Sequence, residues 1–182
     1  MTSVDVLGIT QRYQDALAAA DDDNFETVLS GLRKEVMGNE RNVIEQLRSN
    51  LVAESDVALN VKGVERAELA LGCALALSEA RSDNFEATKL LQGMIDQNSS
   101  QTDLCYFWVA IARFHLGEFR EARLWCEKLL LRHPDNVLPR KLLARIRYRV
   151  RRDGLSGLGI IVAVAVISAV AGNLFGRLRS TA

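Results

Sequence analysis

Few side chains in this 182-residue sequence have the type and spacing that catalysis or metal binding requires. Its two histidines are His115 and His133, and its three cysteines are Cys73, Cys105 and Cys126. The ligands of a zinc site usually come in closely spaced pairs, and these five residues form none. The sequence also lacks a Gly-rich phosphate-binding loop and a nucleophile motif. We therefore predict that the protein is not an enzyme and that it binds neither a metal ion nor a cofactor.

These residues have ordinary structural explanations. Cysteines without a close partner in a helical, cytosolic context are expected to be free buried thiols. His133 comes just before Pro134, where a cation favours the C-terminal end of a helix. The acidic run Asp21-Asp22-Asp23 lacks the glycine and the terminal glutamate of a calcium-binding loop. We therefore interpret this run as a solvated turn.

The charge of the chain is distributed unevenly along its length. From Arg140 onward, nine basic residues accompany one acid, Asp153. The preceding part contains 14 Lys and Arg against 22 Asp and Glu, a net charge of −8. A domain of that sign is not expected to bind nucleic acid, whereas the basic end matches an anionic lipid surface.

An apolar segment near the carboxyl end predicts a single transmembrane helix. Residues 155–175 contain no ionisable side chain, and at about 1.5 Å per residue they reach roughly 30 Å, the thickness of the hydrocarbon core of a bilayer. Arginines flank the segment, where their guanidinium groups can reach lipid phosphates. The membrane-flanking residues are Arg149, Arg151, Arg152, Arg177 and Arg179. We predict a tail anchor over residues 153–182, inserted after translation, with the N-terminal domain facing the cytosol.

The composition of this segment indicates the membrane that it enters. Glycine and alanine dilute its Ile and Val, and each good apolar residue favours insertion by only about 0.3–0.6 kcal/mol. A moderately hydrophobic span with short basic flanks suits the mitochondrial outer membrane or the peroxisome better than the endoplasmic reticulum. The small residues Ser168, Gly172 and Gly176 recur every four positions and could pack two tails together in a homo-oligomer.

The sequence before the tail predicts an all-α fold. Ala, Leu, Glu and Arg dominate, and apolar residues recur at helical spacing. The segment 53–63 fits either a helix or a loop. We predict turns at Ser82-Asp83-Asn84 and at Gly117, and helix caps at Asp103 and at Asp135 or Asn136. The predicted helices cover residues 4–20, 25–36, 43–51, 64–81, 85–95, 104–114 and 119–133, and a last basic helix follows Pro134.

A 34-residue repeat organises the second half of this domain. The shift places Phe85 on Phe119 and Ala76 on Ala110. This is the period of tetratricopeptide repeats, which are helix–turn–helix units. The copy at 103–136 has the fuller signature, and the copy at 69–102 is degenerate. Because two repeats rarely bury enough surface alone, we predict a tetratricopeptide-like helical bundle over 61–152, with the helices of 1–60 and the basic helix as caps.

The first helix of each repeat would line a concave face of this bundle. Such a face would form an apolar groove for a partner helix or for a segment of this chain. The same residues also fit the core between the repeats, and both interpretations stay open at this point. The predicted groove residues are Cys73, Leu77, Ala80, Arg81, Leu104, Phe107, Ile111, Phe114 and His115.

Three sequence motifs carry a family resemblance. They are Tyr106-Phe107-Trp108-Val109-Ala110, Leu116-Gly117-Glu118-Phe119-Arg120-Glu121-Ala122, and the junction Arg151-Arg152-Asp153-Gly154-Leu155 that enters the apolar segment. Together with two repeats, a basic helix and a tail anchor, they resemble the mitochondrial and peroxisomal fission 1 protein family over residues 64–182. The first 60 residues are longer than the family's N-terminal arm and first helix.

The resemblance implies an adaptor on the mitochondrial outer membrane and on peroxisomes. Its groove would recruit a dynamin-related GTPase, directly or through soluble adaptor proteins. An alternative function is a tail-anchored repeat receptor for precursor proteins at the mitochondrial outer membrane, because its groove would also be apolar. The segment 1–60 would then be either a cap or a regulatory arm that folds across the groove.

Overall fold

The computed structural model describes residues 6–20, 24–37, 40–55 and 61–152 of the chain. The chain divides into two compact units, Met1–Ile146 and Arg147–Ala182. Every regular element in the described ranges is a helix, which confirms the predicted all-α class. The predicted tail anchor at 153–182 lies outside the described residues. No helix among the described residues is both long enough and apolar enough to cross a membrane.

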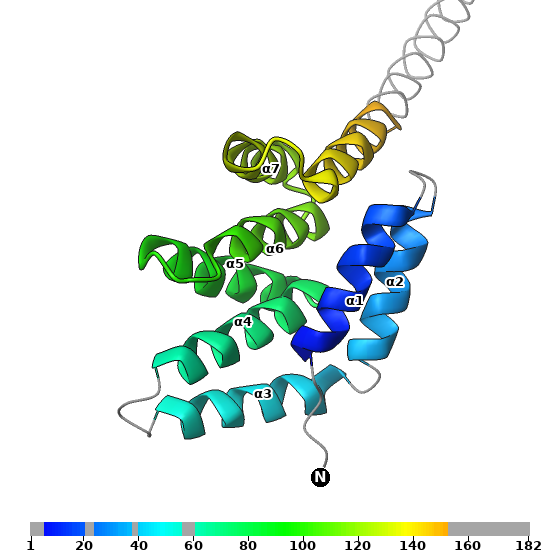
Figure 1. The fold of residues 1–182 in the computed structure, drawn as a ribbon. Helices are drawn as coiled ribbons and strands as arrows, with labels where there is room; N and C mark the ends of the chain where they lie inside the picture. The colour runs from blue at the N-terminus through cyan, green and yellow to red at the C-terminus, as the bar shows by residue number, and fades with distance from the viewer. Residues whose placement is uncertain (1–5, 21–23, 38–39, 56–60, 153–182) are drawn as a thin grey trace, which may run out of the picture. The chain divides into compact units, whose positions relative to one another are not determined.

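The first unit consists of successive helices (Figure 1). They are α1 (Val6–Ala19), α2 (Phe25–Val36), α3 (Glu40–Ser55), α4 (Val61–Leu77), α5 (Arg81–Asp96), α6 (Thr102–His115) and α7 (Phe119–Arg132). Residues 137–152 are also helical, and the boundary between the two units falls within this helix, after Ile146.

Helix α4 lies at the centre of the first unit. It packs against α1, α3, α5 and α6, and its residues Leu69–Leu77 are all buried. A helix that is surrounded by others needs apolar or small side chains on every face, which explains why this stretch has no polar stripe. Figure 1 shows α3, α4, α5 and α6 in succession, with the hairpin of α1 and α2 next to them.

The α1–α2 hairpin belongs to the same hydrophobic core. Leu17 of α1 and Phe25 and Leu32 of α2 are completely buried, and they join the core that α4 and α6 form. Leu142 and Ile146 of the last helix are buried in that core as well. The N-terminal helices therefore contribute to the folding of the unit.

Polar contacts connect the hairpin to the last helix. The Lys141 ammonium group donates a hydrogen bond to the backbone carbonyl of Ala20. The Arg145 guanidinium group forms a two-pronged ion pair with Glu26, with Nε 2.9 Å from Oε1 and Nη2 2.6 Å from Oε2. Such fork-shaped pairing fixes orientation as well as distance, so it holds α2 against the last helix.

The turn between α4 and α5 comes earlier than predicted. Helix α5 begins at Arg81, so the predicted turn at Ser82-Asp83-Asn84 is wrong and these residues form the first turn of the helix. The Ser78 hydroxyl donates to Asp83 (2.7 Å), and the Asn84 amide donates to the Ser78 carbonyl (2.8 Å). Asp83 and Asn84, in the first turn of α5, thus form hydrogen bonds with Ser78 just after the end of α4. Polar residues of these types also form turns, which is why the sequence predicted a turn here.

One predicted cap is confirmed and one is wrong. The Asn136 side chain accepts a hydrogen bond from the Leu138 backbone N–H (3.1 Å), as a cap of the last helix should. Asp103 lies inside α6, and its carboxylate instead accepts hydrogen bonds from Arg132 and His133, both at 2.7 Å. The aspartate is used to connect α6 to the end of α7.

Two further boundaries bear on the sequence predictions. Gly117 has a φ of 77°, which confirms the turn between α6 and α7, because this conformation favours glycine. Helix α3 runs from Glu40 to Ser55, well beyond the predicted 43–51. Its buried residues Val43, Ile44 and Leu47 are on the helix that packs against α4.

The close approach of α4 and α5 at Gly72 leads to a stability prediction. A Cβ atom on Gly72 would lie 2.6 Å from Cδ2 and 2.8 Å from Cγ of Leu91, which is completely buried. We expect Gly72→Ala to lower the free energy of unfolding by about 1–3 kcal/mol, because the core must be displaced.

Gly93→Ala is the matched control for this prediction. Gly93 lies in α5, and a Cβ there meets no atom within 4 Å. This variant should gain up to about 1 kcal/mol from helix propensity. Both effects are measured by chemical denaturation followed by circular dichroism, and equal stability of the two variants would contradict the packing argument.

Candidate functional site

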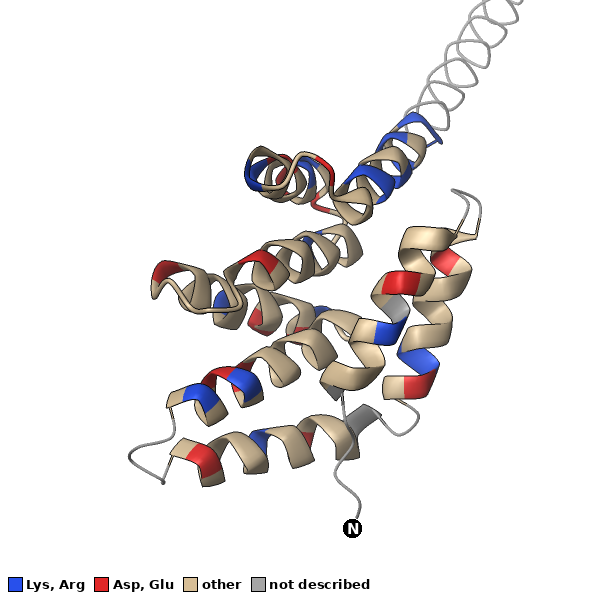
Figure 2. Ribbon diagram, viewed as in Figure 1, with Lys and Arg blue, Asp and Glu red and all other residues tan. Residues whose placement is uncertain are grey.

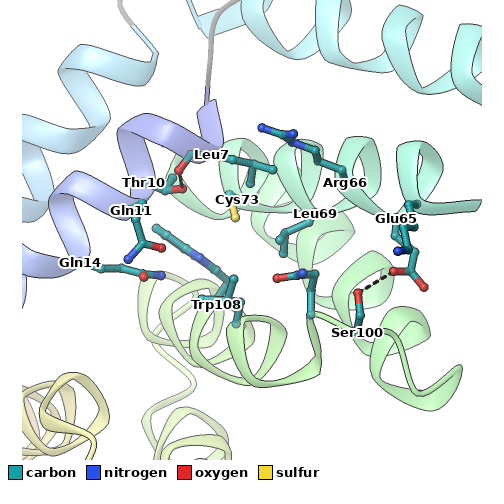
Figure 3. A pocket seen from close by; sticks show the side chains of 13 residues that line it. Leu7, Thr10, Gln11, Gln14, Glu65, Arg66, Leu69, Cys73, Ser100 and Trp108 are labelled. Atoms are coloured by element: carbon teal, nitrogen blue, oxygen red, sulfur yellow. Dashed lines mark hydrogen bonds between the residues drawn. The ribbon is translucent and has the colours of Figure 1, made fainter.

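A cavity of about 360 Å³ lies between α1, α4 and the beginning of α6 (Figure 3). Helix α1 forms one wall, α4 forms the opposite wall, and the loop before α6 closes one side. This volume is within the range of small-ligand sites in proteins, roughly 300–1,000 Å³. Its lining residues are Leu7, Thr10, Gln11, Gln14, Lys62, Glu65, Arg66, Leu69, Cys73, Ser100, Gln101, Leu104 and Trp108.

The deepest part of this cavity is apolar. Leu69, Cys73 and Trp108 line it and are almost completely buried. Burial raises the pKa of the Cys73 thiol well above its usual value, and the nearby Cys105 acts in the same direction. The thiol is therefore uncharged at neutral pH, and it presents sulfur as an apolar surface rather than as a nucleophile or a metal ligand.

The prediction of free buried thiols is confirmed. Cys73, Cys105 and Cys126 are all buried and free. Burial raises the pKa values of Cys105 and Cys126 to about 12 in each case. No group of three or more His, Cys, Asp or Glu side chains converges on a metal-binding geometry within the part of the chain that the structure describes.

Polar side chains lie around the apolar floor. From α1, Gln14 is 8% exposed, and the Thr10 hydroxyl donates to the Leu7 carbonyl (2.9 Å). From α4, Glu65 accepts a hydrogen bond from Ser100 at 2.9 Å. The cavity therefore combines apolar contact area with a few oriented polar groups, which is the usual character of a recognition site.

The predicted groove residues do not form one continuous surface. Two of them, Cys73 and Leu104, line the cavity against α1. Four others are buried in the core of the unit: Leu77, Phe107, Ile111 and Phe114. Those four side chains could contact a partner only if the packing around them changed, so a partner-binding role for them stays a prediction.

The remaining predicted groove residues lie near the end of α4. Arg81 and His115 line a second hollow of about 310 Å³, and Ala80 is exposed in the turn. From α2, Arg33 enters the same hollow, donates to the Leu77 carbonyl and pairs with Glu79 at 3.1 Å. Helix α2 thus covers this end of α4.

His115 is held by the end of α4. Its ring nitrogen Nδ1 donates a hydrogen bond to the Ala76 carbonyl (2.9 Å). Burial is the main cause that lowers the pKa of His115, and the positive charge of Arg33 acts in the same direction. The neutral ring is consequently the form that the folded protein favours.

Sequence reasoning missed the contribution of α1. Thr10 and Gln14 are polar residues that the fold buries, and they occur within the helical spacing of Ile9 and Leu17. A buried polar residue beside an apolar stripe is a signal of a specific contact, but the pattern does not reveal the contacting element. The cavity exists because α1 lies opposite α4, more than fifty residues away in sequence.

The predicted membrane-flanking residues divide between described and undescribed parts of the chain. Figure 2 shows Lys and Arg along the helical residues 137–152. Arg151 and Arg152 are exposed, and Arg149 is half-buried. Arg177 and Arg179 lie outside the described residues.

Comparisons with known proteins find several relatives, although no family model matches the chain. A mitochondrial fission 1 protein of Neurospora crassa is 30% identical over 103 residues, which is 57% of this chain and 67% of the relative. A mitochondrial fission 1 protein of Gibberella zeae has the same identity and the same coverage. A FIS1-related protein of Caenorhabditis elegans, named fis-1, is 27% identical over 130 residues, which is 68% of this chain and 91% of the relative.

A solved structure has a similar fold. It is a crystal structure of yeast Fis1 in complex with an Mdv1 fragment that contains an N-terminal extension and coiled-coil domains. The TM-score is 0.53 at 18% sequence identity, and the match covers 61% of this chain and 84% of the yeast chain. At this identity the likeness supports the helical fold.

The environment of His115 leads to a prediction about pH. Its pKa is lower in the folded state than its ordinary value of 6.5, so the unfolded state binds more protons in this range. The resulting stability is present above pH 6.5 and is lost as the pH falls through the lower folded-state value. His115→Asn keeps a donor for the Ala76 carbonyl, and it should remove this part of the pH dependence.

The measurement compares unfolding midpoints at about pH 7.5 and pH 5.5, on either side of the ordinary histidine value. His133→Asn is the control, because it replaces the other histidine, which is exposed, and leaves His115 in place. In this control, the unfolding midpoint should still decrease between about pH 7.5 and pH 5.5, because His115 is unchanged. An unchanged slope in His115→Asn would show that the decrease has another source.

Proposed function

Because this chain belongs to the mitochondrial fission 1 protein family, we propose that it is an adaptor that recruits fission factors to the mitochondrial surface. The observation that carries this proposal is the 30% identity over 103 residues with relatives named mitochondrial fission 1 protein. The recruited partner would be a soluble adaptor protein or a dynamin-related GTPase. The yeast Fis1 complex with an Mdv1 fragment supports the first of these.

The proposed position of the protein is the mitochondrial outer membrane, with a second population on peroxisomes. The apolar segment 155–175 would span the membrane and leave the helical domain in the cytosol. Arg151 and Arg152, which are exposed, would contact lipid phosphates next to the span. Two copies could associate through the small residues of that segment.

We further propose that α4–α5 and α6–α7 are two tetratricopeptide-like repeats and that a partner binds where α1 meets them. The cavity between α1, α4 and α6 supports this location, because it combines an apolar floor with oriented polar groups. A receptor for precursor proteins is the alternative function, and its groove would also need apolar surface. The two functions differ in whether the bound protein is a fission factor or a precursor.

The α1–α2 hairpin would act as a cap that completes the binding site. Its residues Leu17, Phe25 and Leu32 are completely buried in the common core, which supports a permanent structural role. A regulatory arm would instead need to leave the repeats without exposing so much apolar surface. The cap therefore fits the burial better than a movable arm does.

The adaptor function predicts the effect of one substitution in the cavity. Leu104 lines the cavity and is only half-buried, so Leu104→Asp should place a charge in the site while the core stays intact. We expect capture of fission factors to fall by about tenfold or more. Phe107 and Ile111 are less suitable, because a charge at such buried positions would unfold the domain.

The experiment is proximity labelling from the full-length, membrane-bound protein in cells. Leu131→Asp is the matched control, because Leu131 is 85% exposed on α7 and does not line the cavity. Labelling of dynamin-related GTPases or their linkers by the wild type supports the adaptor. Enrichment of precursor proteins, with normal mitochondrial shape after loss of the protein, would support the receptor instead.

The ion pair between Glu26 and Arg145 tests the cap. Glu26→Arg or Arg145→Glu alone should loosen the hairpin by about 1–3 kcal/mol, because the reversed charge repels the charge that it paired with. Hydrogen exchange of α1 and α2 amides measures this opening, and recruitment should fall with it. The double variant with both charges exchanged should recover protection and recruitment.

Arg123→Glu is the control for this prediction. Among the described residues, Arg123 forms an ion pair with Glu127 on the same helix, and the pair is exposed. The control should therefore change neither hairpin exchange nor recruitment. An increase in recruitment by the single variants would contradict the cap and would indicate a regulatory arm.

A further inference from the structure

Two buried residues that line the cavity between α1 and α4 have polar side-chain groups without hydrogen-bond partners. The side-chain amide of Gln14, which is more than nine-tenths buried, lines the cavity. The indole N–H of Trp108 belongs to a residue that is 1% exposed and lines the same cavity. Within the described residues, neither side chain forms a hydrogen bond. Neither polar group is among the fully enclosed unsatisfied atoms, so both are open to the space of the cavity.

The two groups define what would complement them. The indole N–H is a donor only, whereas the Gln14 amide offers both a donor and an acceptor. An occupant that displaces water from these two groups must replace the hydrogen bonds of that water, so a complementary occupant is favoured. The smallest unit that offers a carbonyl oxygen and an N–H together is an amide, the unit that every peptide chain repeats.

The charged residues that line the cavity are Lys62, Glu65 and Arg66, all from the first turns of α4, and none of them is among its buried lining residues. Figure 3 shows Gln14 and Trp108 on one side of the cavity, with Glu65 and Ser100 on the other side. The Glu65 carboxylate already accepts a hydrogen bond from Ser100. Among the buried residues that line this floor, Cys73 is the only one with a titratable side chain. Burial raises the pKa of its thiol, which is therefore protonated at neutral pH.

The apolar floor indicates the rest of the occupant. Leu69, Cys73 and Trp108 offer apolar contact area, and Leu7 of α1 and Leu104 of α6 extend it. An apolar side chain attached to the bound amide would remove this surface from water. A charged side chain placed on this floor would lose its hydration, and the charged lining residues Lys62, Glu65 and Arg66 are not among the residues that form the floor.

We propose that this cavity binds an uncharged peptide unit, a backbone amide with an adjacent apolar side chain, through Gln14 and Trp108, while α1 stays in place as one wall of the site. In the function proposed above, this unit belongs to an extended segment of the recruited partner, and the inference rests on that function for the identity of the partner. Helix α1 thus becomes a recognition element as well as a cap.

The test uses N-acetyl-L-leucine N-methylamide as the probe and the full-length chain in detergent micelles. The sequence contains two tryptophans, Trp108 and Trp125, so fluorotryptophan labelling gives two fluorine NMR signals. Trp125 stacks with Lys128 and does not line the cavity, so its signal is an internal control. Trp125→Phe assigns the two signals.

The probe should shift the Trp108 signal with a roughly millimolar Kd, as expected for a ligand of this size, and leave the Trp125 signal unchanged. N-acetyl-L-leucine, which has a carboxylate in place of the second amide, should bind at least about fivefold more weakly. Gln14→Leu should weaken binding of the amide probe by about five- to tenfold. Gln46→Leu, the same substitution on α3 and outside the cavity, should have no effect.

Two results would overturn the proposal. One is an unshifted Trp108 signal at ten times the expected Kd, in a chain whose melting temperature shows that it is folded. The other is equal binding of the amide probe by wild type and Gln14→Leu. Probe binding without capture of fission factors in cells would leave the amide site standing and reject the adaptor function, whereas Leu104-dependent capture without probe binding would reject the amide site alone.

Discussion

The burial of α4 on all sides is the constraint on which the rest of this structure depends. Its residues Leu69–Leu77 have no exposed face, so other helices must surround them if the chain is to fold. Helices α3, α5 and α6 cover part of this surface, and α1 covers another part. The hairpin of α1 and α2 is therefore required by the composition of α4, and its own buried residues join the same core.

The same constraint explains where polar groups gather. The end of α4 places backbone carbonyls in the interior, and each of them meets a donor from a different element: Arg33 at Leu77, His115 at Ala76 and Asn84 at Ser78. Paired groups of this kind stabilise the turn and fix the order of the helices. At the side facing α1, by contrast, Gln14 and Trp108 keep unpaired groups in a cavity. The carbonyls at one end of α4 are thus paired internally, and another side of the helix lines the cavity for which we propose a ligand.

The helical fold could be predicted well from the sequence because helix periodicity is local information. Helix α2 matched its predicted range of 25–36, and Gly117 formed the predicted turn. The errors occurred where a polar residue has two compatible roles. Ser82, Asp83 and Asn84 read as a turn but form the first turn of α5, and Asp103 reads as a cap but connects α6 to Arg132 and His133. In both cases the side-chain hydrogen bonds in the folded protein determine the role of the residue, and the local sequence pattern does not identify these partners.

The sequence by itself determined the helices, the 34-residue repeat, the free thiols and the family, because each depends on residue types at short or regular spacing. The tertiary structure alone decided which of the predicted groove residues are buried and which line a cavity. It buried Leu77, Phe107, Ile111 and Phe114 in the core and left Leu104 and Cys73 at a cavity. It also brought α1 against α4, which added Gln14 to the site. The physical reason is that burial depends on which helix covers which face, and this pairing joins segments far apart in sequence.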